Sequence, residues 1–180
     1  MIKKIVVIGP ESTGKSILCK QLAEHFKTVW AEEYARTFLE GRGAAYDFDD
    51  LYEIAKGQIK NEEEAVLNAQ LTIQPPQLVF IDTDLYVVKV WSEFVYNKCD
   101  NRILTQIAIR KYDLYLLCNT DIPWIKDSLR EYPDLETRKK LFEYYKDAML
   151  NQHVPWIEIK GKDDERLQAA IEAVDSILSR

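Results

Sequence analysis

The segment 9–16, which reads GPESTGKS, constrains this chain more than any other feature because it matches the pattern G-x-x-x-x-G-K-[ST]. The β-branched run 3–8 (KKIVVI) precedes it, and the stretch 15–25 that follows carries apolar residues at helical spacing. A loop bounded by glycines can curl so that its backbone N–H groups point inward at a phosphate chain, and the helix after it adds free N–H groups and a dipole. The segment therefore predicts a nucleoside triphosphate site at the end of a buried strand.

Individual contacts to the triphosphate follow from the mechanics of this motif. Lys15 is expected to reach the β- and γ-phosphates, and Ser16 is expected to offer its hydroxyl to Mg²⁺. The remaining nucleotide contacts are expected from the loop and the first turn of the helix, at Gly9, Glu11, Ser12, Thr13, Gly14 and Ile17. The alternative is a chance match, which the flanking strand and helix disfavour.

Runs typical of strands alternate with runs typical of helices along the whole chain. The expected strands are 3–8, 27–31, 77–84, 112–118 and 156–161. The expected helices are 15–25, 33–40, 47–70, 85–96, 103–110, 135–150 and 167–178, with Asp49 or Asp50 capping the longest. This alternation predicts an α/β protein with the P-loop NTPase fold, in which about five parallel strands carry helices on both faces. A single domain, 1–180, is expected, with a short lid at approximately 119–140.

Composition argues against several other classes of protein. The 180 residues carry a net charge of −6 and no long basic run, so a nucleic-acid partner is not expected. The three cysteines lack metal-type spacing and argue against a disulfide framework, and two histidines make a histidine-based metal site improbable. The sequence has no signal peptide and no apolar run near ~18 residues, which predicts a cytoplasmic protein with no membrane partner. The oligomeric state is left open.

Carboxylates follow two of the expected strands, at the edge where parallel sheets bind their ligands. Asp82 is expected to face the metal ion, usually through its water shell, whereas Asp84 could instead cap the next helix. Glu33 could accept a proton from an attacking hydroxyl if its strand neighbours the strand before the P-loop. Arg36 could pair with Glu33 or with phosphate, and the alternative for Glu33 is a solvated helix start.

Charged and aromatic side chains complete the expected site. Arg130 is the first choice for a lid cation that reaches the transferred phosphate, ahead of Lys126 and Arg138. The alternative for each of them is an exposed charge on a loop. Most aromatic side chains at helical spacing belong to a core, but some could stack on a flat substrate ring. From the aromatic residues Tyr34, Tyr46, Tyr86, Trp91 and Trp124 we select Tyr34, Trp91 and Trp124 as substrate contacts.

Six sequence segments follow one another along the chain in this order: GPESTGKS, WAEEYAR, DLYEIAKGQ, FIDTD, YDLYLLCNTDIPWIKDSLR and IKGKDDERLQAA. Over essentially all of its length the chain resembles the kinase domain of NadR-type proteins, the P-loop nicotinamide riboside kinases. The resemblance implies phosphorylation of the 5′-hydroxyl of nicotinamide riboside by ATP with Mg²⁺, which gives nicotinamide mononucleotide. In such a reaction, Lys15 and Arg130 are expected to neutralise the charge on the transferring group, and either Glu33 or Asp82 is expected to orient the hydroxyl or take its proton, so all four are catalytic candidates.

The same resemblance implies further site residues. Arg36 would lie near the riboside with Glu33, Asp84 near the metal ion or the ribose, and Trp124 in the lid. Lys162 and Arg166, in the loop after the last strand, would border the adenine, and the alternative for that loop is a plain helix start.

The sequence departs from the longer NadR proteins, which also carry an adenylyltransferase domain and sometimes a DNA-binding domain. The chain has no H-x-G-H motif and no room for either domain, so a stand-alone kinase is expected, and it could serve another riboside. Two other classes stay open: a P-loop ATPase or GTPase switch, and a nucleotide-sensing regulatory protein. The segment NTDIPW lacks the lysine of the N-K-x-D guanine motif that small GTPases carry.

Overall fold

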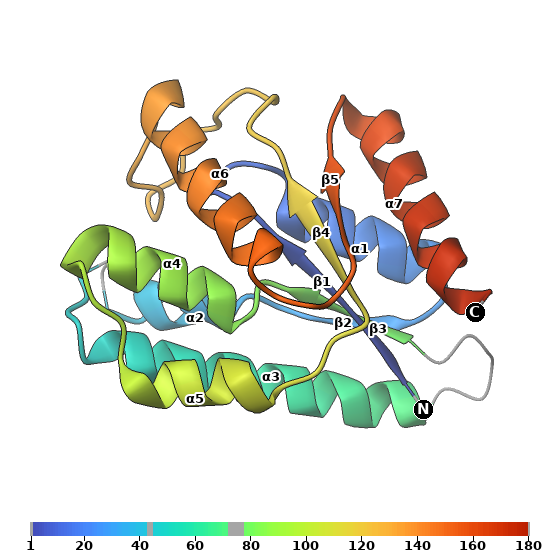
Figure 1. Ribbon diagram of the computed structural model, residues 1–180, viewed down its shortest axis with the longest axis horizontal. Helices are drawn as coiled ribbons and strands as arrows, with labels where there is room; N and C mark the ends of the chain where they lie inside the picture. Colours follow the sequence, from blue (N-terminus) through green and yellow to red (C-terminus); the bar gives the residue numbers. More distant parts are fainter. Residues whose placement is uncertain (1, 43–44, 72–77, 180) are drawn as a thin grey trace.

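A five-stranded parallel sheet forms the centre of the molecule in the computed structural model, which describes residues 2–42, 45–71 and 78–179 (Figure 1). The strand order is β2-β3-β1-β4-β5, and every pairing is parallel. The strands are β1 (Lys3–Ile8), β2 (Val29–Ala31), β3 (Leu78–Asp82), β4 (Leu114–Cys118) and β5 (Trp156–Ile159). The expected α/β architecture of about five parallel strands is confirmed.

Helices cover both faces of this sheet. They are α1 (Lys15–His25), α2 (Tyr34–Glu40), α3 (Asp50–Gln70), α4 (Leu85–Tyr96), α5 (Asn101–Ile109), α6 (Leu135–Leu150) and α7 (Asp163–Leu178). Because side chains alternate along a strand, Ile5 and Val7 of β1 pack with α1 and α7, whereas Val6 and Ile8 pack with α3, α4 and α6. All four of these β1 side chains are fully buried, which explains why the strand is apolar on both faces.

Several element boundaries agree with the sequence-based expectation, and the differences have local causes. The bounds of β1, α1, α4 and α6 are confirmed residue for residue. The start of α7 lies four residues earlier than expected, where the Glu165 carboxylate accepts the backbone N–H of Lys162 at 3.0 Å. Asp49 occupies the N-cap position of α3, as expected, but its side chain makes no capping hydrogen bond. The Asp47 carboxylate instead accepts the backbone N–H groups of Asp49 and Asp50. Residue 77, where the third strand was expected to begin, lies outside the described residues.

The strand order decides what surrounds the P-loop. The P-loop follows the carboxyl end of β1, and β1 lies between β3 on one side and β4 on the other. Gly9 has a φ of +140°, and a Cβ there would lie 2.6 Å from the carbonyl oxygen of Cys118, so this position requires glycine. The strand β2 is separated from β1 by β3, so the adjacency considered for Glu33 does not occur.

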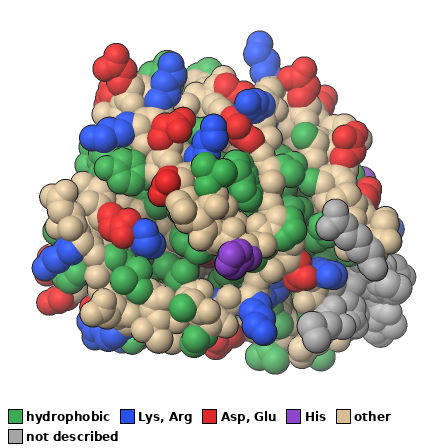
Figure 2. All heavy atoms as spheres, viewed as in Figure 1, with side chains coloured by type: hydrophobic (Ala, Val, Ile, Leu, Met, Phe, Trp, Pro, Cys, Tyr) green, Lys and Arg blue, Asp and Glu red, His purple; other side chains and the backbone are tan. Residues whose placement is uncertain are grey.

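The face of the molecule in Figure 2 carries acidic and basic side chains interspersed with apolar ones. Within the described part of the chain, no helix combines the length and the apolar character needed to cross a membrane.

Candidate active site

A cavity opens at the carboxyl edge of the sheet, between the P-loop, α2, α3, α4, α6 and the segment 129–131. Among the residues lining it are Gly9, Glu11, Ser12, Thr13, Gly14, Lys15, Ser16, Ile17, Glu33, Arg36, Trp91 and Arg130, all of them predicted from the sequence. One wall of the cavity is charged and the other is apolar.

The P-loop has the geometry of an anion site. Gly9 and Gly14 have φ values of 140° and 77°, and the Thr13 hydroxyl donates to the carbonyl of Pro10 at 2.7 Å, which closes the turn. The Lys15 Nζ also donates to Pro10, at 2.9 Å, so its ammonium lies over the loop. No side chain caps α1, and its first turn holds no acidic residue, so the N–H groups there stay available to phosphate oxygens.

Asp82 provides a buried carboxylate beside the P-loop. Its residue is 1 % exposed, and its Oδ1 is buried without a hydrogen-bond partner among the described residues, while the carboxylate is hydrogen-bonded to Ser16. Burial and then the negative charge of Glu33 raise the pKa of Asp82 to about 7, against the opposing charge of Lys15.

This donor set fits Mg²⁺. An unpartnered carboxylate oxygen next to a hydroxyl offers the hard oxygen ligands that the ion prefers. Among the described residues, no cluster of three or more His, Cys, Asp or Glu side chains could hold a metal ion. Mg²⁺ needs no such cage, because it usually keeps several waters and shares its remaining positions with substrate phosphates.

Glu33 reaches the same cavity from the outer strand β2. It occupies the N-cap position of α2, and its carboxylate makes no capping hydrogen bond. Its negative charge is, after burial, the second cause of the raised pKa of Asp82, the last residue of the neighbouring strand β3. Arg36 also lines the cavity and is held by Asp127, whose carboxylate lies 2.9 Å from its Nη2.

The segment 125–132, which belongs to the expected lid, is attached to the P-loop by hydrogen bonds to two P-loop residues. The Glu11 carboxylate accepts the backbone N–H groups of Glu131 and Tyr132, at 3.0 and 2.6 Å. The Ser12 hydroxyl accepts the N–H of Ile125 at 2.9 Å, and Nη1 of Arg130 lies 3.3 Å from the same oxygen. Glu11 and Ser12 were predicted as nucleotide contacts, and in the structure their side chains bind this segment.

Three residues that were predicted to contact the substrate, Tyr34, Asp84 and Trp124, do not line the cavity. Asp84 is 2 % exposed; its carboxylate caps α4 by accepting the N–H of Tyr86 and also accepts the hydroxyl of Tyr115, at 2.9 and 2.7 Å. The ring of Tyr34 packs so closely on Gly57 that a Cβ there would lie 2.1 Å from it. These two residues and Trp124, whose indole N–H is buried, do not line the cavity. Asp84 thus acts as the helix cap that the sequence analysis had considered as its alternative role, and the substrate contacts of the three residues stay predictions.

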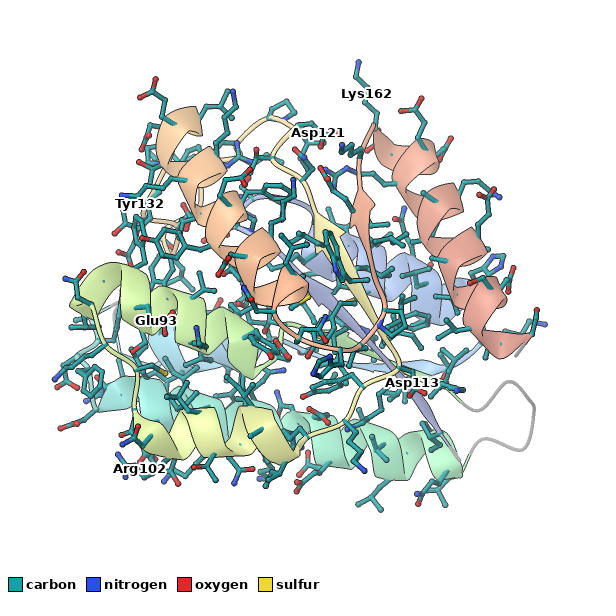
Figure 3. The ribbon with its side chains drawn as sticks, viewed as in Figure 1. Glu93, Arg102, Asp113, Asp121, Tyr132 and Lys162 are labelled. Atoms are coloured by element: carbon teal, nitrogen blue, oxygen red, sulfur yellow. The ribbon has the colours of Figure 1, made fainter. Side chains whose placement is uncertain are left out.

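Lys162 and Arg166 also lie outside the cavity. Figure 3 shows Lys162 projecting outward at the start of α7. Arg166 is 6 % exposed, forms an ion pair with Asp121 and donates to three backbone carbonyls, among them that of Thr13 at 2.9 Å. Its guanidinium therefore supports the P-loop, while the contact of Lys162 and Arg166 with adenine stays a prediction.

Tyr46, which was considered but not selected from the sequence, also lines the cavity. The lining residues that the sequence did not suggest are one acidic residue and a set of mostly apolar ones: Glu131, Pro10, Ala35, Leu39, Leu51, Ile54, Val87, Val88, Leu129, Leu141 and Tyr145. Leu51 and Ile54 carry the same helical periodicity as core residues, so nothing in the pattern marks a cavity wall. Arg138, ranked behind Arg130 as a lid cation, is 2 % exposed and donates to the carbonyl of Ser12 at 3.0 Å. It therefore braces the P-loop.

Comparisons with known proteins agree with this geometry. The chain is 25 % identical to the trifunctional NAD biosynthesis/regulator protein NadR of Escherichia coli (strain K12) and 26 % identical to its counterpart in Salmonella typhimurium. Each alignment covers 98 % of this chain and 43 % of the relative, so the chain spans less than half the length of the curated relatives it matches.

Comparison with solved structures also finds a NadR protein, and in addition a thymidylate kinase. A NadR protein in complex with NR superposes with a TM-score of 0.75 at 25 % identity, over 99 % of this chain and 50 % of the other. Thymidylate kinase from Ehrlichia chaffeensis, at 15 % identity, shares the fold with a TM-score of 0.67 over 96 % of this chain and 98 % of its own. The predicted P-loop kinase fold and the resemblance to NadR are thus confirmed. A family described as AAA domain matches residues 4–166, and the chain belongs to that family.

Proposed function

We propose that this protein transfers the γ-phosphoryl group of ATP to the 5′-hydroxyl of a riboside, and that the riboside is nicotinamide riboside. The observation that carries the proposal is one cavity lined by the P-loop, Glu33 and an apolar aromatic wall. Asp82 does not line this cavity but lies buried next to it, where its carboxylate is hydrogen-bonded to the P-loop residue Ser16. Similarity to NadR over 98 % of the chain, and a NadR structure that contains NR (nicotinamide riboside), support this substrate.

The P-loop would hold the phosphates of ATP. Its backbone N–H groups and the ammonium of Lys15 would bind the β- and γ-phosphate oxygens. Ser16 and Asp82 would hold Mg²⁺, which would neutralise the charge that develops on these oxygens. Arg130, held next to Ser12, would face the transferring group from the side of the lid.

Glu33 and Asp82 are the two candidates for orienting the acceptor hydroxyl and taking its proton. Asp82 already has a hydrogen bond to Ser16 and is the residue that fits the metal ion. Glu33 lines the cavity, and among the described residues its carboxylate has no hydrogen-bond donor. We therefore assign the general base to Glu33 and the metal contact to Asp82.

The apolar wall would receive the base of the riboside. Trp91 and Tyr46 lie on it, and an aromatic face attracts a cationic ring such as nicotinamide in its riboside. A lid over the cavity would exclude water, which would otherwise accept the phosphoryl group.

The test is ADP release with ATP and Mg²⁺ in the presence of no acceptor, nicotinamide riboside, uridine, adenosine or simple sugars, with product masses recorded. The proposal expects strong stimulation by nicotinamide riboside and formation of nicotinamide mononucleotide. Stimulation by a different riboside alone would replace the substrate and keep the kinase. Steady ADP release that no acceptor changes would replace the kinase with an ATPase.

A further inference from the structure

We propose that Glu131 is a specificity-determining residue, which favours a riboside with a positively charged base over a neutral one of the same shape. The inference rests on the proposed function, because it concerns the wall that would receive the base. Glu131 lines the cavity beside Tyr46 and Trp91. Neither the P-loop motif nor the expected lid cation accounts for an acidic residue at this place.

A hydrogen-bond chain orients the side chain of Glu131. The indole N–H of Trp91 donates to the hydroxyl of Tyr46 at 2.6 Å. With its oxygen engaged in this way, the Tyr46 hydroxyl directs its own hydrogen to the Glu131 carboxylate. Two aromatic rings and one carboxylate are thereby joined on a single wall.

The backbone of Glu131 is fixed independently of its side chain. Its N–H donates to the Glu11 carboxylate at 3.0 Å, and the neighbouring N–H of Tyr132 donates to the same group at 2.6 Å. Because this attachment uses the backbone, a change of the Glu131 side chain leaves it in place. The lid segment therefore presents Glu131 to the cavity from a fixed position.

The charge of Glu131 has no counter-ion in the described part of the chain. No ion pair there includes it, and the cations that line the cavity have other partners. Arg36 is paired with Glu40 and Asp127, Lys15 lies over the P-loop, and Arg130 is bound at Ser12. A cationic ring on the aromatic wall would supply the missing positive charge, and a neutral ring would not.

The size of the effect follows from the exposure of the site. Glu131 keeps contact with solvent, so water and salt screen its charge. An ion pair in such a setting changes a binding constant by about 1.5- to fivefold, and less at high ionic strength. The discrimination should therefore be modest and should depend on salt.

The experiment compares Glu131→Gln with the native protein on two acceptors, nicotinamide riboside and its neutral 1,4-dihydro form. Glutamine keeps an oxygen that can accept from Tyr46, so the substitution removes the charge alone. The expected result is a loss of about 1.5- to fivefold in the ratio of kcat/KM for the cationic over the neutral acceptor at low salt. This loss should shrink at 0.5 M salt, and Glu131→Asp should retain the native preference.

Glu136→Gln is the matched control, because Glu136 is an exposed carboxylate in the first turn of α6 that does not line the cavity. It should leave the ratio unchanged. An unchanged ratio in Glu131→Gln, with nicotinamide riboside still phosphorylated, would overturn the role of Glu131 and leave the proposed function standing. If the native protein phosphorylates neither acceptor, the proposed function fails, and this inference fails with it.

Discussion

Asp82 is the last residue of β3 and Asp84 follows two positions later, and their surroundings give them different roles. Thr83 between them has a left-handed φ of 66°. Asp82 keeps an unpartnered oxygen beside the P-loop, whereas both oxygens of Asp84 are engaged, by Tyr86 and by Tyr115. The sequence anticipated the cap, because Asp84 was considered as the N-cap of the next helix and Asp82 as the residue that faces the metal ion. Neither the turn at Thr83 nor the distant partner Tyr115 is visible in a local pattern.

Glu33 and Asp82 can be distinguished by two substitutions. Glu33→Gln should lower kcat by about 10²–10⁴-fold, because it removes the base, and should leave the Mg²⁺ requirement unchanged. Asp82→Asn should instead raise the Mg²⁺ concentration for half-maximal rate by about ten- to a hundredfold, because it removes the metal contact. Initial rates in a Mg²⁺ titration measure both effects. The opposite pattern would exchange the two assignments.

At the scale of the elements, the sequence predicted what is local and missed what is distant. The run KKIVVI and the glycine-bounded loop marked β1 and the start of α1 correctly, because burial on both faces and loop chemistry leave local signals. The strand order depends on pairings between residues far apart, such as Lys3 with Leu78, and no periodicity reports these. For the same reason the pattern could not show that α7 reaches across to the P-loop through Arg166.

Arg166 lies in the first turns of α7 and Lys162 is its N-cap residue. Substitution of these two residues should change the free energy of unfolding by very different amounts. Arg166→Leu should lower the free energy of unfolding by about 2–3 kcal/mol, because it leaves the carbonyls of Thr13 and Asn119 and the carboxylate of Asp121 without their donor. Lys162→Ala should change it by less than about 0.5 kcal/mol, because its side chain is exposed. Urea unfolding measures both values, and equal losses would refute the bracing role of Arg166.

At the scale of the whole molecule, the candidate site is built on a packed core. Leu51, Ile54 and Val88 belong to a buried cluster that also includes Leu85 and Ile103, and the first three line the cavity as well. The same side chains therefore stabilise the fold and shape the apolar wall. This double use explains why the wall could not be separated from the core in the sequence.

The three cysteines report on the packing of two hydrophobic clusters, one with Cys19 and Cys118 and the other with Cys99. Cys19 and Cys118 are fully buried between the sheet and its helices, and burial raises the pKa of Cys118 to about 11 and that of Cys19 well above its ordinary value. Partial burial raises the pKa of Cys99 to about 11. A raised pKa lowers the thiolate fraction, so a thiol reagent at pH 8 should react slowly with the native protein, at Cys99 first. All three should react quickly in denaturant, and rapid native labelling of all three would contradict the packing.

The most direct test of the central claim is the fate of the γ-phosphoryl group. ATP labelled at the γ-phosphate is incubated with the protein, Mg²⁺ and nicotinamide riboside, and the label is divided between the riboside monophosphate and inorganic phosphate. We predict that the label enters nicotinamide mononucleotide, and that Lys15→Ala, with an unchanged melting temperature, lowers this transfer by at least about a hundredfold. Label that enters inorganic phosphate at the same rate with and without the riboside would contradict the account.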